Sequence, residues 1–233
     1  MKNVKLVSRD KDSAVYRIKD YKQFGPKLLN EIGWTEGPKY QAFEFKAFAP
    51  RQGYLNPVVP AGCSLRVAYY ARPGQIKVPA GFKPLPGLEL VPAKNFPEFR
   101  ELNRTSLYRE YIKPYKSRLS RAFIKLCDDF IDGDLKKCRN MVIKLKGRTV
   151  GIASTAKGKA KGKPGMFIPW IWIDPKLPKA VRENARHLVA KWLRGHSTPL
   201  LYTAEHGFSK KTQKFFSSLG FKPERYIVDS LEG

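Results

Sequence analysis

The second half of the chain alternates helix and strand patterns, and few folds accommodate that order. Two helical segments come first, from Pro97 to Pro114 and from Lys116 to Phe130. The later segments are, in order, a hairpin over 140–153, a strand over 166–173, a helix over 180–194, a strand over 200–204, a helix from Ser209 to Leu219 and a strand over 225–228. Helices that alternate with strands cover the faces of a sheet. The sequence therefore predicts an α/β fold with a mixed, twisted sheet flanked by helices.

The helix over 180–194 has the clearest periodicity. Its apolar residues recur at intervals of three and four and form one stripe, whereas the basic residues lie off that stripe, at Arg182, Arg186, Lys191 and Arg194. Gly195 ends the pattern. We expect this helix to pack on the sheet with one face and to present a basic face on the other side.

The first 96 residues have a different texture. Their strand patterns are short and separated by turns, at 5–7, 14–18, 40–48 and 63–70. Six prolines and three glycines from Pro73 to Pro97 exclude a regular helix and indicate an extended connector. The sequence thus predicts a β-rich N-terminal portion with a proline-rich connector, 1–96, and a second domain, 97–233. Whether the first portion folds alone or completes the sheet of the second stays open.

The net charge of +25 calls for an anionic partner, because like charges on one compact body repel. The excess runs through the chain, with 16 basic against 7 acidic residues in 1–96 and 29 against 13 in 97–233. A detachable basic arm does not explain it, so we expect a basic folded surface that binds nucleic acid. The alternatives are an anionic membrane surface or an acidic protein as the partner, or a lysine coat that only keeps the chain soluble.

A lysine- and glycine-rich segment follows the hairpin, and its cations are Lys157, Lys159, Lys161 and Lys163. We expect a flexible cationic loop that follows a phosphate backbone with little sequence preference. Arg186, Lys210 and Lys211 on two later helices extend this patch. A second basic cluster neighbours three tyrosines that either stack on bases or cover the sheet, Tyr108, Tyr111 and Tyr115.

Cysteine and histidine usage predicts no metal site. The three cysteines, Cys63, Cys127 and Cys138, stand in no metal-ligand spacing, and the three histidines are scattered. Few cysteines in an odd number favour a reducing compartment, so we expect a cytoplasmic protein. Since no uncharged run reaches about 18 residues, we expect no membrane-spanning segment.

Two local patterns in 97–233 resemble the GNAT superfamily of N-acyltransferases. The first is Ser209-x-x-Thr212-x-x-Phe215-Phe216-Ser217-Ser218-Leu219-Gly220-Phe221, which is similar to the last helix of that family and its Leu-Gly-Phe end. The second is a hairpin with Gly147 and Gly151, then a strand ending Trp172-Ile173-Asp174-Pro175, then an amphipathic helix. It is similar to the family's central hairpin, its acetyl-CoA strand and its pyrophosphate-binding helix.

The resemblance implies acetyl-CoA or another acyl-CoA as the donor. The cofactor-binding residues that it implies are Ile173, Lys176, Lys179, Ala180, Arg182 and Ser209. The family's pyrophosphate turn carries glycines, whereas 176–184 has none, so we expect the cations of this stretch to hold phosphate by charge at a helix N-terminus. The family's usual general acid, a tyrosine of the last helix, falls on Phe216, which has no proton to give.

Four residues are candidates for catalysis. Glu205 and His206 follow the strand over 200–204, Tyr202 within it can replace the missing acid, and Asp174 ends the tryptophan-rich strand. The alternative is structural: Tyr202 packs in the core, Asp174 caps the next turn, and Glu205 and His206 are solvated.

Three functions fit these patterns. The first is acyl-CoA-dependent N-acyl transfer to an amine on or near nucleic acid. The second is a GNAT-like module without activity that binds DNA or RNA. The third is an enzyme like the phage DNA-modification proteins that use this fold with a different donor. The sequence leaves open whether the chain is an enzyme.

Overall fold

One continuous sheet organises the molecule. The computed structural model describes residues 4–9, 13–18, 26–31, 40–46, 63–115, 121–160, 163–206 and 210–230. Its strands are β1 (Val4–Arg9), β2 (Ser13–Ile18), β3 (Tyr40–Lys46), β4 (Cys63–Ala71), β5 (Leu88–Pro92), β6 (Arg139–Leu145), β7 (Arg148–Ala160), β8 (Lys163–Ile173), β9 (Leu201–His206) and β10 (Lys222–Ser230). Ten strands pair in the order β1-β2-β3-β10-β4-β9-β8-β7-β6-β5, with both parallel and antiparallel neighbours.

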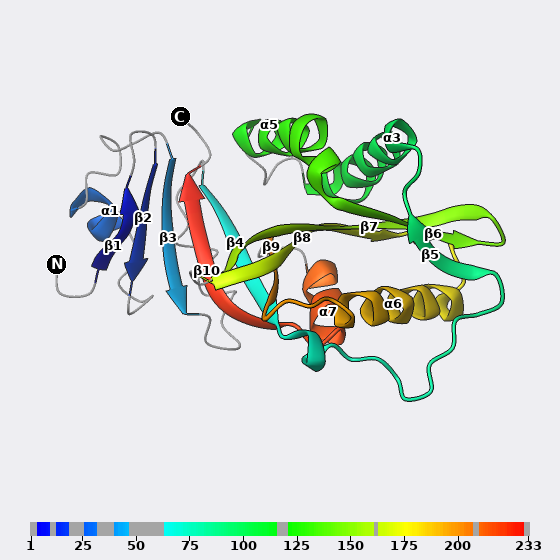
Figure 1. Cartoon of the computed structure of the whole chain (residues 1–233). Coiled ribbons are helices and arrows are strands. Elements are labelled where there is room, and N and C mark those ends of the chain that lie inside the picture. The colour runs from blue at the N-terminus through cyan, green and yellow to red at the C-terminus, as the bar shows by residue number, and fades with distance from the viewer. Residues whose placement is uncertain are drawn as a thin grey trace.

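Helices lie on both faces of this sheet (Figure 1). They are α1 (Pro26–Glu31), α3 (Phe96–Leu107), α4 (Lys113–Tyr115), α5 (Arg121–Asp129), α6 (Lys179–Arg194) and α7 (Lys210–Ser218), with 3₁₀ turns η3 (Pro73–Gln75) and η7 (Leu135–Lys137) and π-helical segments η4 (Tyr108–Ile112) and η6 (Phe130–Asp134). The α3 and α5 helices lie on one side, and α6 and α7 on the other. The predicted mixed sheet flanked by helices, after a β-rich N-terminal portion, is confirmed.

Local sequence explains where these elements begin and turn. The α3 helix starts after Asn95, whose side chain accepts a hydrogen bond from the backbone N–H of Glu98 at 3.3 Å, and Pro97 stands in its first turn. The β6–β7 hairpin turns at Lys146 and Gly147, which have φ angles of 49° and 81°. Both angles are positive, as a tight two-residue hairpin turn requires.

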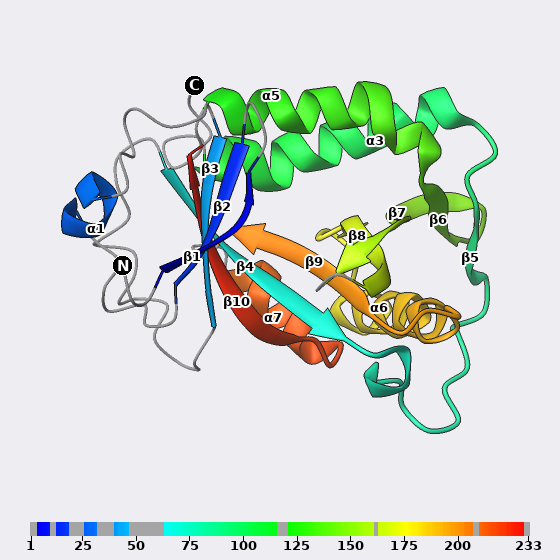
Figure 2. The same ribbon diagram turned by 60° about the vertical axis from the view of Figure 1, so that its left-hand side comes forward.

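The N-terminal portion completes the sheet of the second half. The β4 strand runs antiparallel between β9 and β10, and β5 pairs with β6 at the far edge. Figure 2 shows β4 lying between β9 and β10 when the sheet is turned. The question that the sequence left open is therefore answered: residues on both sides of the proline-rich connector share one sheet.

The parallel pair β8 and β9 separates after a short contact. Only Met166 pairs with Leu201 and Phe167 with Tyr202. Beyond this point β9 stays with β4 as far as His206, whereas β8 stays with β7 as far as Ile173. The two halves of the sheet part here, and this gap positions the site described below.

Each face of the sheet has its own hydrophobic core. The core under α6 and α7 contains Ile168, Val189 and Phe216, with Ile171 and Ile173 of β8 packed against it. The core under α3 and the segments that follow it is a separate cluster of buried residues, among them Phe99, Leu107, Ile131, Leu135 and Trp172. Over residues 170–173, alternation along β8 sends Ile171 and Ile173 to one core and Trp170 and Trp172 to the other. Within the described ranges, no helix is both long and apolar enough to cross a bilayer.

The lysine- and glycine-rich segment forms a strand pair, and the prediction of a flexible loop is wrong. The β7 strand continues to Ala160, and β8 begins at Lys163. Gly158 pairs with Gly165, and a side chain at Gly158 would overlap the Tyr202 hydroxyl. Lys157 and Lys159 are exposed, so their charges stay in water while the backbone pairs.

A buried histidine makes the stability of the fold depend on pH. His196 is 9% exposed, and its Nδ1 lies 3.0 Å from the carbonyl of Trp192. A carbonyl only accepts, so Nδ1 carries the proton, and Nε2 accepts from the Thr155 hydroxyl at 3.3 Å. Burial, with a smaller effect of nearby Arg139, lowers the pKa of His196 below its usual value.

We expect the protein to lose stability as the pH falls below about 6.5, where an unfolded histidine takes up a proton. Above that pH both states hold the neutral ring, so the full stability is present. Each 1 kcal/mol lost lowers Tm by about 2–4 °C in a chain of this size. Between pH 7.5 and 5.0, Tm should fall more steeply with decreasing pH for the native chain than for His196→Gln. Burial also lowers the pKa of His187, so the fall of Tm with pH is measured for His187→Gln as well and compared with that of His196→Gln. Equal slopes for the native chain and His196→Gln would contradict the assignment.

Candidate active site

A pocket of about 400 Å³ lies where β8 leaves β9. Its lining comes from both faces of the sheet, since η4, the end of β8, α6 and α7 all contribute. The lining residues are Glu110, Tyr111, Trp170, Ile171, Trp172, Ile173, Pro175, Lys179, Arg182, Glu183, Arg186, Lys211, Thr212, Phe215 and Phe216. The pocket thus reaches the two cores, through the gap between the two halves of the sheet.

The wall formed by α6 and α7 is predominantly cationic, and Glu183 is the one acidic residue among its described lining residues. Lys179, Arg182 and Arg186 follow the first turns of α6, and Lys211 faces them from α7. Pro178 precedes α6, no side chain caps the helix, and its first turn holds no acidic residue. The first backbone N–H groups of a helix have no partner within the helix and carry partial positive charge. This wall therefore presents fixed charges and free backbone donors to an anion.

Two side-chain donors at the pocket are buried and have no partner among the described atoms. They are the indole Nε1 of Trp172 and the Nε of Arg182. A buried donor without an acceptor costs about 1–3 kcal/mol, so such groups are rare in folded proteins. Their position at one pocket indicates a ligand that carries acceptor atoms.

The opposite wall is aromatic and acidic. The π-helical segment η4 interrupts the helix after α3 and brings Glu110 and Tyr111 to the pocket. The Tyr111 ring meets Trp170 edge to face at 6.0 Å. The Trp170 indole N–H donates to the Ser106 hydroxyl at 3.1 Å, and that hydroxyl donates to the carbonyl of Asn103 at 2.9 Å. This chain of contacts fixes β8 against α3.

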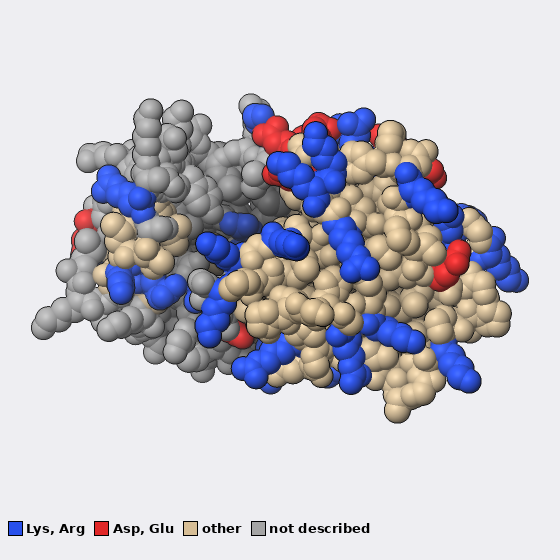
Figure 3. All heavy atoms as spheres, in the orientation of Figure 1, with Lys and Arg blue, Asp and Glu red and all other residues tan. Residues whose placement is uncertain are grey.

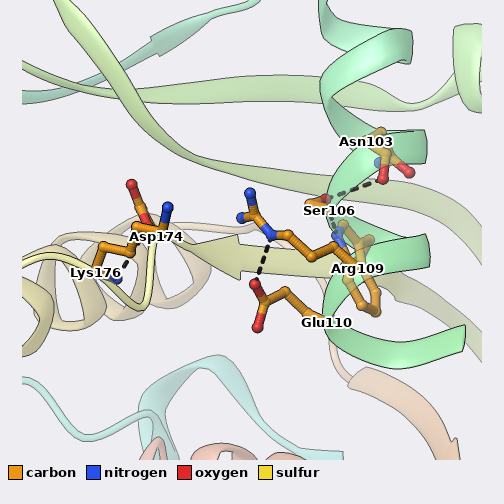
Figure 4. Close-up of polar contacts among 7 residues, drawn as sticks. Asn103, Ser106, Arg109, Glu110, Asp174 and Lys176 are labelled. Atoms are coloured by element: carbon orange, nitrogen blue, oxygen red, sulfur yellow. Dashed lines mark hydrogen bonds and ion pairs between the residues drawn. The ribbon is translucent and has the colours of Figure 1, made fainter. Parts of the chain in front are cut away.

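Arg109 reaches across this wall from the same segment. Its Nε donates to Oε1 of Glu110 at 2.8 Å, and its guanidinium carbon lies 5.5 Å from the centre of the Trp172 ring. In Figure 4 the side chains of Arg109 and Glu110 extend from the helix toward the turn that carries Asp174 and Lys176. The acidic wall is therefore paired with a cation of the chain itself.

The floor of the pocket has no hydroxyl at the position of the family's tyrosine. Phe216 is 3% exposed, lies 6.2 Å from the ring of Tyr69 and packs edge to face on Phe215 and Phe221. Its environment is the hydrophobic core, where a phenyl ring needs no polar partner.

Three of the predicted cofactor residues line the pocket, namely Ile173, Lys179 and Arg182. Lys176 is exposed in the turn before α6, and Ala180 is exposed in the first turn of that helix. Neither lines the pocket. Ser209 lies outside the described residues.

Of the candidate catalytic residues, Tyr202 and Asp174 are described with their side chains, and neither lines the pocket. Tyr202 packs between Tyr70 and Phe167, and burial raises the pKa of its hydroxyl. The Asp174 carboxylate accepts the backbone N–H of Lys176 at 3.0 Å and so caps the turn before α6. Glu205 and His206 end β9, on the far side of the gap from β8, and their side chains are outside the described part of the chain.

The residues predicted to bind nucleic acid fall in two places. Arg186 and Lys211 line the pocket. The side chain of Lys210 lies outside the described part of the chain. Lys157, Lys159 and Lys163 are exposed on the β7–β8 ribbon, and Lys161 is not described. On the face in Figure 3, Lys and Arg side chains are scattered over the described surface, not gathered in one patch.

Sequence reasoning missed the acidic wall. Tyr111 is buried, at 5% exposed, but nothing in the sequence marks the π-helical segment that turns Glu110 to the pocket. The nearest signal is Pro114, which interrupts the helical pattern just after it. Among the described residues, no group of three His, Cys, Asp or Glu side chains could hold a metal ion.

The strands and helices around the pocket follow a defined order. A hairpin leads into β8, the parallel pair β8–β9 separates, and α6 connects them over one face. This is the mixed sheet flanked by helices that the sequence predicted for the second half of the chain.

Comparison with solved structures shows a likeness in fold to one protein. A functionally unknown conserved protein from Staphylococcus epidermidis aligns at a TM-score of 0.54 with 10% identity, over 98% of this chain and 94% of that one. A tandem GNAT protein from the clavulanic acid biosynthesis pathway gives 0.49 with 11% identity, over 92% and 74%. A GCN5-related N-acetyltransferase from Kribbella flavida gives 0.44 with 14% identity, over 93% and 79%. The sequence itself matches no protein-family model and no curated protein.

Proposed function

We propose that the chain is an N-acyltransferase that takes its acyl group from acyl-CoA in the pocket at the end of β8. The observation that carries this proposal is the joint position of the uncapped, cationic N-terminus of α6 and two unpartnered buried donors at that one pocket. A pyrophosphate with a long apolar arm satisfies both features. Its phosphates suit the helix N-terminus, and its arm suits the aromatic gap.

The residues present fit acyl-CoA through charge. No glycine lies between Lys176 and Asn184. The backbone N–H groups therefore cannot approach the phosphates as closely as they do in the glycine-containing turn of the family. Lys179, Arg182 and Arg186 would hold the phosphates together with the free N–H groups of the first turn. When bound, acyl-CoA supplies an acyl group activated as a thioester.

The remaining walls suit the acceptor. Glu110 lies on the wall away from α6, where a carboxylate attracts a positively charged group of the acceptor. Phe216 holds no proton, so protonation of the leaving thiol falls to solvent or to another group. Glu205, His206, Tyr202 and Asp174 stay predictions as the groups that move protons.

Nucleic acid is the second part of the proposal. The β7–β8 ribbon extends beyond β6, which pairs with β7 only as far as Thr155, and it carries Lys157, Lys159 and Lys163 exposed. Such an arm can follow a phosphate backbone without reading bases. If the pocket lacks activity, this ribbon and the net charge of +25 still favour a nucleic-acid-binding protein.

A melting experiment with acetyl-CoA tests the proposal. At about a hundred times a micromolar Kd, a ligand that binds only the folded state adds about 2.7 kcal/mol of stability. We expect Tm to rise with acetyl-CoA and to rise less with acetate plus pantetheine, which lack the phosphates. No shift with acetyl-CoA would exclude the acyltransferase.

A parallel arm uses a short DNA duplex at about 50 and 200 mM salt. Phosphate contacts release counterions, so a rise in Tm that disappears at the higher salt supports the nucleic-acid part. A shift with DNA alone would leave a binding protein built on this fold. The phage-type DNA-modification alternative also predicts that result, because this arm contains no donor from which a group could be transferred.

A further inference from the structure

We propose that Arg109 occupies a binding site for a guanidinium group of the acceptor, formed by Glu110 and the face of Trp172. This inference rests on the proposed function, because the acceptor enters the pocket whose other wall binds the donor. Arg109 is then an internal occupant that the ligand displaces. The ligand class is a molecule with a guanidinium at one end and an amine at the other.

The contacts of Arg109 are those that a guanidinium ligand would make. Its Nε donates to the Glu110 carboxylate at 2.8 Å, while the guanidinium carbon lies 5.5 Å from the Trp172 ring centre. A planar cation over an indole face within about 6 Å is attracted by the ring. The guanidinium of Arg109 thus contacts both the Glu110 carboxylate and the Trp172 ring at the pocket.

The walls of this site are fixed, whereas its occupant is exposed. Trp172 is 9% exposed and Tyr111, the neighbour of Glu110, is 5% exposed. The Tyr108 hydroxyl, at the start of the same π-helical segment, donates to Asp128 at 2.8 Å. The Arg109 side chain is 47% exposed, against 23% for Glu110. Arg109 can therefore leave its position without disturbing the core, and Glu110 and Trp172 would stay in place.

The chemistry favours a guanidinium over an ammonium. A guanidinium is flat, is weakly hydrated, and donates to a carboxylate while it stacks on an aromatic ring. An ammonium is a strongly hydrated point charge and makes only one of these contacts well. The net charge of +25 repels cations in general, so a local carboxylate and ring are needed to hold one here.

Calorimetry of agmatine binding, without any acyl-CoA, tests the inference. Agmatine carries a guanidinium and a primary amine. Removing the internal competitor in Arg109→Ala should tighten agmatine binding about tenfold, which corresponds to about 1.4 kcal/mol. Glu110→Gln should abolish the binding at the same concentrations. The matched control is Arg104→Ala, which removes an arginine of α3 that pairs with Asp132 of η6, and it should leave agmatine affinity unchanged.

Further arms separate the possible origins of the effect. Cadaverine has an ammonium in place of the guanidinium, and we expect it to gain less than threefold from Arg109→Ala. A short peptide with one arginine shows whether the ligand is a protein side chain or a free amine. Unchanged or weaker agmatine binding by Arg109→Ala would overturn the inference, and so would an equal gain for cadaverine. Acetyl-CoA melting of the same variant is scored separately, so a failure here leaves the proposed function intact.

Discussion

A chain that begins at Pro97 is expected not to fold. It lacks β4, which pairs on both sides, with β9 and with β10, in the middle of the sheet. It also lacks the buried side chains of Val67 and Tyr69, which belong to the core under α6 and α7. Burying one large apolar side chain contributes about 1.5–3 kcal/mol, and whole domains have only about 5–15 kcal/mol of stability. Size-exclusion chromatography and circular dichroism should show an aggregated or unfolded product.

The matched control begins at Cys63. It keeps β4 and the connector but loses β1, β2 and β3, which lie together at one end of the sheet (Figure 1). We expect this shorter chain to unfold cooperatively on heating, with a lower Tm than the full chain. A cooperative transition in the chain from Pro97 would contradict the assignment of β4 as an integral strand. The predicted division into 1–96 and 97–233 would then describe two independent units.

Arg182→Met is expected to weaken acetyl-CoA binding roughly tenfold to a hundredfold. A hydrogen bond between charged groups contributes about 1.5–3 kcal/mol, and Arg182 brings both a charge and an unpartnered buried Nε to the pocket. Without a ligand the same substitution should leave Tm unchanged or slightly raised. It removes a buried donor that has no acceptor and keeps a long apolar side chain.

Arg194→Met, at the exposed C-terminal end of the same helix, is the control for a general loss of charge. It should leave the calorimetric affinity for acetyl-CoA within about twofold of the native value, because exposed charges beyond one Debye length are screened. An equal loss for both variants would mean that net charge, and not the pocket, holds the phosphates.

Much of the fold is written in local sequence. The stripe of α6, the Asn95 cap of α3 and the Lys146-Gly147 turn each need only neighbours within a few residues, so their elements were predicted. The insertion of β4 between β9 and β10 depends on pairing between residues at least 130 positions apart. No local pattern specifies such a pairing, so the sequence left open how the N-terminal portion is used.

The site divides in the same way. Lys179, Arg182 and Ile173 were implied by the resemblance of this strand and helix to those of the GNAT superfamily, and all three line the pocket. Glu110 and Arg109 depend on a π-helical segment, whose extra residue per turn leaves no signature in the periodicity of α3. The β7–β8 ribbon was missed because glycine and lysine are usual in loops, whereas here the partner strand supplies the backbone hydrogen bonds.

Amide hydrogen exchange with and without acetyl-CoA tests the central claim most directly. The N–H groups of Lys179, Ala180 and Val181 open α6 without a capping side chain, so they should exchange fast in the free protein. The account predicts that acetyl-CoA slows exchange in this first turn and at the end of β8, but not in β1 or β2. Protection elsewhere in the chain, with the first turn of α6 unchanged, would contradict it.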